Sequence, residues 1–335
     1  MVEERLQLLL GAARGTDRIL ILPHNDPDPD AIAGAVALRH LLAQTLNIEG
    51  RIGYQGIIGR AENKALIRYL GHPLRRLKDP DIHRAGAIAL IDTQPGTGNN
   101  PLPPSRSPTI VFDHHPWHEE TAAAAFADVR SDLGATSTIL TEYLKTTGIE
   151  LTPPLATALF YGIKTDTMGL GRGASPADAA AYFYLQPSID VDALIEIERA
   201  QVPAEYFRSF DIALRAARVF DNVVIAYIGQ MGYPDLVAEM ADLLLRLEGI
   251  RWAICMGAYH GELVLSVRTR GRRGGAGGLA QNMVEGRGTA GGHGTMAGGH
   301  LPLAGEDPEQ VAVQLGQRAL QLLKVEAGTP GKALI

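Results

Sequence analysis

Three apolar runs in the first half of the chain each end on a carboxylate or an imidazole. RILIL (Arg18–Leu22) is followed by His24, AIALI by Asp92, and TIVF by Asp113 and two histidines. Such runs predict buried strands, and open α/β sheets place their functional sites at the carboxyl ends of their strands. The pattern therefore predicts an α/β fold with a mainly parallel sheet flanked by helices, and a site at one edge of that sheet.

The stretch FDHHP, residues 112–116, concentrates the most reactive side chains. His114 and His115 are neighbouring imidazoles beside the carboxylate of Asp113. Bringing them together costs solvation and flexibility, and metal binding is the commonest way to offset that cost. An exposed polar turn is the alternative interpretation of these three residues alone.

The loop PHNDPDPDAIAG, residues 23–34, repeats this placement after the first strand. Its prolines exclude regular structure through the acidic part, and Asp30 is expected to cap the helix that follows. His24, Asp28 and Asp30 would then lie on one tight turn. Repulsion among these carboxylates and Asp26 would be relieved by a cation, so the loop favours a metal role over helix capping alone.

Two further acids follow apolar segments. Asp92 precedes a Pro-Gly loop, and Asp166 ends the helical segment PPLATALFYGIKTDT. Alone, they are compatible with a turn former and a solvated helix-end acid. With the loop and the histidines, however, they complete a set of hard oxygen and imidazole donors: His24, Asp28, Asp30, Asp92, His114 and Asp166. Such a set suits a pair of divalent cations that share one carboxylate, with Mn²⁺ or Mg²⁺ favoured over a soft-ligand metal.

Charge and cysteine content exclude several functional classes. A net charge of -6 argues against a broad basic surface for long nucleic acids, although a local basic pocket for a short phosphorylated ligand is compatible with it. The only cysteine, Cys255, excludes an intramolecular disulfide and a thiolate zinc site. No apolar run approaches the length of about 18 residues that a transmembrane helix needs. The N-terminal helix lacks a signal-peptide cleavage pattern, so we expect a cytoplasmic protein without a membrane partner.

A chain of 335 residues suggests two domains. We expect a catalytic domain over residues 1–190, a helical linker over 191–220, and a smaller α/β domain with a mixed sheet over 221–330. Residues 271–299 are dominated by Gly, Arg and Ala. We interpret them as a binding segment with a helix near 279–285, because a flexible spacer, the alternative, does not need the histidines of AGGHGTMAGGH.

HNDPDPDA, the acid in LIDTQ, FDHH and the acid in IKTDT resemble, in order, the four motifs of the DHH phosphoesterase superfamily. VRT followed by GGHGTMAGG resembles the DHH-associated C-terminal domain of its RecJ and NrnA-type members, and the likeness is strongest to the NrnA type. The resemblance covers nearly the whole chain. It departs from the family pattern at Pro29, where glycine is usual, and at Ala290 and Met296 in the second motif.

The resemblance also implies a role for each matched residue. His24 and Asp28 would hold one cation, Asp30, His114 and Asp166 the other, and Asp92 would bridge them. His115 would face the scissile phosphate, and Asp113 would orient a neighbouring histidine. In the second domain the phosphate or terminal nucleotide of the substrate would be gripped by Arg268, Gly291, Gly292, His293 and Gly294.

The function so implied is metal-dependent hydrolysis of short oligonucleotides or nucleotide bisphosphates. A RecJ-like exonuclease is the first alternative, but the aromatic-rich basic channel expected for long single strands is not evident. Hydrolysis of a linear or cyclic dinucleotide messenger stays open, and pyrophosphatase activity ranks lower. A binding module that has lost the chemistry would have lost ligands, whereas all six positions are filled. The sequence leaves open the exact substrate, the direction of cleavage, the physiological metal, whether the chain forms a homodimer, and the role of residues 271–290.

Overall fold

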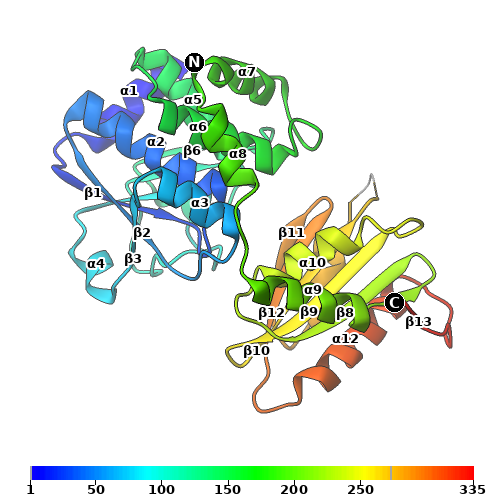
Figure 1. Cartoon of the computed structure of the whole chain (residues 1–335). Coiled ribbons are helices and arrows are strands. Elements are labelled where there is room, and N and C mark those ends of the chain that lie inside the picture. The colour runs from blue at the N-terminus through cyan, green and yellow to red at the C-terminus, as the bar shows by residue number, and fades with distance from the viewer. Residues whose placement is uncertain (1, 272–273) are drawn as a thin grey trace. The chain divides into compact units, whose positions relative to one another are not determined.

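The computed structural model describes residues 2–271 and 274–335, except for the side chains of Asp79 and His293. The chain forms two compact units, Met1–Ala200 and Gln201–Ile335 (Figure 1). The first is built on a parallel sheet and the second on a mixed sheet. The predicted fold class, α/β with two domains, is therefore confirmed.

Sheet A of the first unit has six parallel strands: β1 (Arg18–Pro23), β2 (Glu49–Tyr54), β3 (Leu74–Arg76), β4 (Ala87–Ile91), β5 (Ile110–Asp113) and β6 (Phe126–Val129). Their order across the sheet is β3-β2-β1-β4-β5-β6. The order reverses between β1 and β4, and in open α/β sheets ligands bind outside the carboxyl ends of the strands at such a point. The topology alone therefore places a site after β1 and β4.

Both faces of sheet A are buried, as expected for parallel strands. In β1, Ile19 and Ile21 contribute to one core cluster, whereas Leu20 and Leu22 contribute to the cluster on the opposite face. The helices of this unit are α1 (Val2–Ala13), α2 (Pro29–Leu46), α3 (Ala61–Tyr69), α4 (Asp79–Arg84), α5 (Thr136–Thr147), α6 (Pro153–Thr167), α7 (Pro176–Leu185) and α8 (Val191–Glu198), with the 3-10 turns η1 (Glu119–Ala123) and η2 (Gln186–Ser188).

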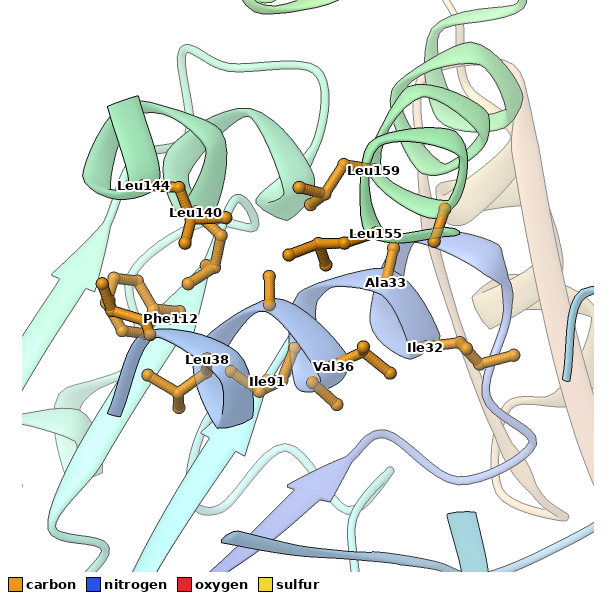
Figure 2. Close-up of a cluster of buried hydrophobic side chains, with 14 of the residues drawn as sticks. Ile32, Ala33, Val36, Leu38, Ile91, Phe112, Leu140, Leu144, Leu155 and Leu159 are labelled. Atoms are coloured by element: carbon orange, nitrogen blue, oxygen red, sulfur yellow. The ribbon is translucent and has the colours of Figure 1, made fainter. Parts of the chain in front are cut away.

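Helix α2 is the centre of the first unit. It packs on strands β1, β2 and β4 and is covered on its other side by α5 and α6. Its small, apolar sequence AIAGAVAL fits this position, because a helix that is apolar on every side must be buried. Figure 2 shows Leu155 and Leu159 of α6 above α2 and Ile91 of the sheet on the other side, with Phe112 close to Leu140 and Leu144 of α5. This packing fixes the position of α2 relative to α6, and with it the ligand-bearing end of each helix.

Sheet B of the second unit has seven strands: β7 (Arg218–Phe220), β8 (Val223–Gln230), β9 (Trp252–Tyr259), β10 (Glu262–Thr269), β11 (Thr289–His293), β12 (Met296–Pro302) and β13 (Lys332–Ala333). Strands β8 and β9 are parallel and the other neighbours are antiparallel. One face is covered by α9 (Ala204–Ala216) and α10 (Leu236–Leu244), the other by α11 (Ala276–Val284) and α12 (Pro308–Leu322).

The glycine-rich segment forms helix α11 and the β11–β12 hairpin, where only a helix was expected. A side chain at Gly277 would place its Cβ 2.1 Å from the carbonyl oxygen of Gly292. A Cβ at Gly292 would lie 2.4 Å from the carbonyl oxygen of Met296, at a φ of +144°. Gly277 therefore permits α11 to lie against the hairpin backbone, and Gly292 permits the close pairing of β11 with β12.

The segment predicted as a helical linker, residues 191–220, is not one continuous helix. It contains α8, which belongs to the first unit, and α9 and β7, which belong to the second. Pro203 lies between the helices and has no N–H to donate, which favours the break. Among the described residues, no helix has both the length and the apolar character needed to cross a membrane.

Candidate metal centre

The carboxyl edge of sheet A gathers the predicted metal ligands. His24 follows β1, Asp92 follows β4, and His114 follows β5. Asp28 and Asp30 lie at the start of α2, and Asp166 lies in the last turn of α6. Residues that are far apart in the sequence therefore meet at the point where the strand order reverses.

The expectation that Asp30 caps α2 was wrong. Asp28 is the capping residue, and its Oδ1 accepts a hydrogen bond of 3.0 Å from the backbone N–H of Ala31. Pro29 occupies the first helical position, where its fixed φ is suitable and no N–H is needed. The helix thus starts at Pro29, two residues earlier than a cap at Asp30 would place it.

Asp30 instead points into the protein and is fully buried. Its two carboxylate oxygens accept backbone hydrogen bonds at the start of α5, from Thr136 at 2.7 Å and from Ser137 at 2.8 Å. These donors orient the carboxylate. Asp26, in contrast, accepts from the N–H of Ile57 at 2.6 Å and fixes the loop.

The six predicted ligands form two groups that share Asp92. His24 Nε2 lies 3.6 Å from Asp28 Oδ1 and 3.6 Å from Asp92 Oδ2. His114 Nε2 lies 3.4 Å from Asp92 Oδ1 and 3.4 Å from Asp166 Oδ2. Asp30 completes the second group, in which the candidate ligand atoms of Asp30, His114 and Asp166 lie within 4.8 Å of one another. Asp92, His114 and His115 form a third possible group, which the resemblance did not imply.

The donor atoms fit divalent cations. Nε2 of His114 is buried and has no hydrogen-bond partner within the described part of the chain. The other ring nitrogen, Nδ1, lies 3.3 Å from the carbonyl oxygen of Leu133, and Nδ1 of His24 lies 2.7 Å from that of Asn25. Carbonyls accept from Nδ1–H, so both imidazoles present Nε2 to the carboxylates, as metal-binding histidines do.

Proton affinities at this cluster reflect crowded charges. Burial alone would lower the pKa of His24, but the hydrogen bond to Asp28 and the charges of Asp28 and Asp92 raise it from 6.5 to about 10. The pKa of His114 is likewise raised well above its ordinary value, against the effect of burial, by Asp166, Asp92 and Asp30. Burial and neighbouring carboxylates raise the pKa of Asp166 to about 6.

Cation binding should therefore release protons. Because the pKa values of His24 and His114 are raised, we expect both rings to be positively charged, with both nitrogens protonated, near pH 7 in the metal-free protein. A cation requires neutral imidazoles, so we expect release of about two protons and an affinity that rises with pH as these pKa values are approached. Calorimetric Mn²⁺ titrations in buffers of different ionisation enthalpy measure this number. Binding without proton release, and with no pH dependence above pH 7, would contradict it.

Asp113 and His115 form a hydrogen-bonded pair at the cluster, where His115 Nδ1 also lies 3.7 Å from Asp92 Oδ1. Nδ1 of His115 donates to Asp113 Oδ1 at 2.8 Å, and the same oxygen accepts from the backbone N–H of His114 at 2.8 Å. Asp113 is 1% exposed, whereas the side chain of His115 is 38% exposed. Despite burial, Asp113 raises the pKa of His115, whose ring is therefore held in one orientation by a buried carboxylate.

Gln94 was missed by sequence reasoning. It is fully buried, and its Nε2 donates to Asp113 Oδ2 at 2.6 Å and to the carbonyl oxygen of Pro116 at 2.9 Å. Its Oε1 accepts from the N–H of His118 at 2.8 Å and from Thr121 Oγ1 at 2.9 Å. This side-chain amide uses both ends to hold Asp113 and the loop after it, a role that its place in LIDTQ did not indicate.

Replacing Gln94 with leucine should misplace Asp113 and His115. We expect a fall in turnover of about 10–100-fold, typical for residues that orient metal ligands or catalytic groups. Without the hydrogen bond from Gln94, Asp113 interacts more strongly with the protonated ring of His115 and raises its pKa further. The limb of the pH–rate profile that reports His115 should therefore move to higher pH. The same replacement at the exposed Gln186, on the 3-10 turn η2, serves as the matched control. An unchanged pH profile with only lower stability would mean that Gln94 is purely structural.

The residues expected to bind the phosphate of the substrate lie in the second unit. Not all of them have free donors, because Arg268 already has hydrogen-bond partners. Arg268 is buried, and its Nε donates to Asp242 Oδ1 at 2.6 Å and its Nη1 to Ser266 Oγ at 2.8 Å. Gly292 is required by the hairpin, but a Cβ at Gly291 or Gly294 would meet no atom within 4 Å. The side chain of His293 lies outside the described residues.

A parallel α/β domain with acids and imidazoles grouped at its switch point defines the class of this protein. Residues 18–163 match the DHH family, N-terminal domain. The matched residues make up less than half of the chain, and members of this family are metal-dependent phosphoesterases.

Curated relatives and a solved structure share this organisation. An uncharacterized protein of Methanocaldococcus jannaschii is 38% identical over 85% of this chain and 58% of its own length. The probable bifunctional oligoribonuclease and PAP phosphatase NrnA of Streptococcus mutans is 24% identical over 65% of this chain and 66% of its own. The cyclic-di-AMP phosphodiesterase GdpP of Geobacillus thermodenitrificans is 26% identical over 70% of this chain and 38% of its own.

An exopolyphosphatase-related protein from Bacteroides fragilis has the same fold, with a TM-score of 0.76 over 96% of this chain and 97% of that one, at 17% identity. The chain spans between 38% and 66% of the length of the three curated relatives.

Proposed function

We propose that this chain is a metal-dependent phosphodiesterase that hydrolyses short oligonucleotides, such as dinucleotides, or nucleotide bisphosphates such as 3′-phosphoadenosine 5′-phosphate. The observation that carries the proposal is the pair of ligand groups that share Asp92 at the carboxyl edge of sheet A. The residues of these groups would hold two divalent cations, Mn²⁺ first and Mg²⁺ as the alternative, which would supply an activated water and offset the charge of the phosphoryl group.

The protein's own residues define the geometry of this reaction. Asp92 offers one oxygen to each group, and Thr136 Oγ1 donates to its Oδ1 at 2.9 Å, which fixes the orientation of the shared carboxylate. His115 faces the scissile phosphate and donates from Nε2 to a phosphate oxygen. Asp113 keeps the proton on Nδ1, so the protonated ring presents its second N–H to the substrate.

The second unit has its own candidate groups for binding a phosphate. The backbone N–H groups near Gly291 and Gly294 can approach a phosphate closely, because a Cβ at either glycine would meet no described atom within 4 Å. Arg268 would bind the same phosphate by exchanging part of its pairing with Asp242. A short substrate agrees with the net charge of -6 and the 6% aromatic content, which do not suit a long single-strand channel.

A substrate panel tests the proposal. Dinucleotides, 3′-phosphoadenosine 5′-phosphate, cyclic dinucleotides and a longer single strand should be assayed with Mn²⁺, and we expect hydrolysis of the first two. The relative named as a cyclic-di-AMP phosphodiesterase makes preference for a cyclic dinucleotide the second candidate. Cleavage of the long strand alone would favour the RecJ-like alternative, and absence of all cleavage would favour a binding module.

A further inference from the structure

A cavity of about 400 Å³ lies at the other end of the first unit from the metal centre. Its walls are the second half of α2, the start of β2, Leu70 at the end of α3, and the first turn of α6. Asp30, at the start of α2, precedes His40 by ten residues, a separation of about 15 Å along a helix. The cavity is thus distinct from the ligand groups, and its volume is within the range of small-molecule sites.

Arg39 supplies the positive charge of this cavity. It is partly buried, and no carboxylate among the residues that the structure describes lies within ion-pair distance of it. Burial lowers the pKa of Arg39, and no neighbouring acid offsets the effect. A Cβ at Gly50 would lie 2.8 Å from Arg39 Cγ, so the glycine makes room for the arginine stem along the cavity wall. A partly buried guanidinium without a counter-charge is costly unless an anion joins it.

The acid in the cavity wall does not neutralise Arg39. Glu49 accepts instead from Arg18 Nε at 3.0 Å and from Arg51 Nε at 3.4 Å, both on the outer surface. His40 lines the cavity next to Arg39, and its Nε2 is buried without a hydrogen-bond partner in the described residues. Burial and the charge of Arg39 lower the pKa of His40, so within the described part of the chain Arg39 is the charged group at this cavity that lacks an acidic partner.

The rest of the lining is apolar except at the start of α6. Val36, Ala43, Ile48 and Leu155 contribute hydrocarbon surface, and Leu155 projects toward α2 in Figure 2. Because α6 begins with two prolines, which carry no N–H, its first free backbone donor belongs to Leu155. A helix start adds positive potential on the same side as Arg39.

From this arrangement we infer a second ligand site, which binds a small organic anion: one carboxylate or phosphate head group on Arg39, with an apolar or aromatic body against α2 and α6. Neither the cluster at Asp92 nor the second unit takes part. The site is independent of the reaction proposed above.

Binding of phenyl phosphate to the full chain, measured by calorimetry with benzoate and inorganic phosphate as further probes, tests the inference. We expect saturable binding of phenyl phosphate and weaker binding of inorganic phosphate, which lacks the apolar body. Arg39→Gln should weaken binding at least about tenfold, typical of losing one charge-assisted pair. Arg68→Gln, an equal charge change on exposed α3 close to Leu70, should leave binding unchanged.

Repeating the titration with a chelator present distinguishes binding at this site from binding at the metal centre. Removing divalent cations should leave phenyl phosphate binding unchanged, since no metal ligand lines the cavity. Binding that requires the cation, that survives Arg39→Gln, or that is absent in the wild type overturns the inference. Comparison of phenyl phosphate with benzoate then shows which head group the site prefers. Circular dichroism of Arg39→Gln confirms that lost binding does not arise from unfolding.

Discussion

Replacing Asp92 with asparagine should lower turnover by about three orders of magnitude, equivalent to roughly 4 kcal/mol of transition-state stabilisation. Asp92 is 2% exposed and lies between the two imidazoles, with Oδ1 toward His114 and Oδ2 toward His24. An amide keeps the shape but loses the charge, and its NH₂ group must face one of the two ligand groups. The variant should therefore bind fewer cations as well as react slowly.

Steady-state kinetics with a dinucleotide and Mn²⁺ titration by calorimetry measure both effects of this change. Asp132→Asn provides the control, since it removes the same charge from an exposed position outside the cluster. The bridging role of Asp92 is refuted if the Asp92 variant retains the parental rate and cation stoichiometry. His114→Ala should likewise abolish Mn²⁺-dependent turnover, because it removes the ligand atom that faces Asp92 and Asp166.

Replacing Asp128 with asparagine should destabilise the first unit by roughly 3 kcal/mol, the lower part of the range for breaking a buried ion pair, because Arg5 is half exposed. Asp128 is fully buried on β6 and pairs with Arg5. It also accepts from Arg130 Nε and Nη2 at 2.8 and 2.7 Å, and from the hydroxyl of Tyr143 at 2.8 Å. An amide leaves these donors with one acceptor oxygen and removes the negative charge that faces Arg5, while Arg130 keeps its ion pair with Glu142 at 2.5 Å.

Thermal unfolding of the full chain measures this loss, and the expected fall in the midpoint is roughly 10 °C for a unit of this size. Asp211→Asn in α9 is the contrasting change, because Asp211 forms only an exposed ion pair with Arg215 and its loss should not move the midpoint. An Asp128 variant that unfolds at the parental temperature would show that the network contributes little to stability.

The fold class followed from the apolar runs because buried parallel strands are apolar on both faces. β1, β4 and β5 are of this kind, and each lies where its run predicted. β6 was missed, because its four residues include Asp128, and an acid in so short a segment resembles a turn until its partners Arg5 and Tyr143 are known. The β11–β12 hairpin was missed because glycine is rare in strands, and the close approach of α11 that requires it is a tertiary feature.

At the metal centre, too, some residues could be predicted from the sequence and others only from the folded structure. Residues with a chemically distinctive side chain, such as His24 and His114, could be proposed from type and position alone. Gln94 and Thr136 could not, because an amide and a hydroxyl have many uses and their partners Asp113 and Asp92 are identified only by the folded geometry. Arg39 was missed for a related reason: the sequence cannot show that an arginine has no counter-charge.

The strand order of sheet A also determines when the metal centre can form during folding. Its candidate ligands follow β1, β4 and β5 or lie at the start of α2 and the end of α6, so the chain between His24 and Asp166 must close several long loops before they meet. Contacts of such high sequence separation form slowly, and the cluster should be among the last features to become native. A cation that binds only the completed cluster would then stabilise the native state by mass action. Its uptake could serve as a kinetic probe for the completion of folding in the first unit.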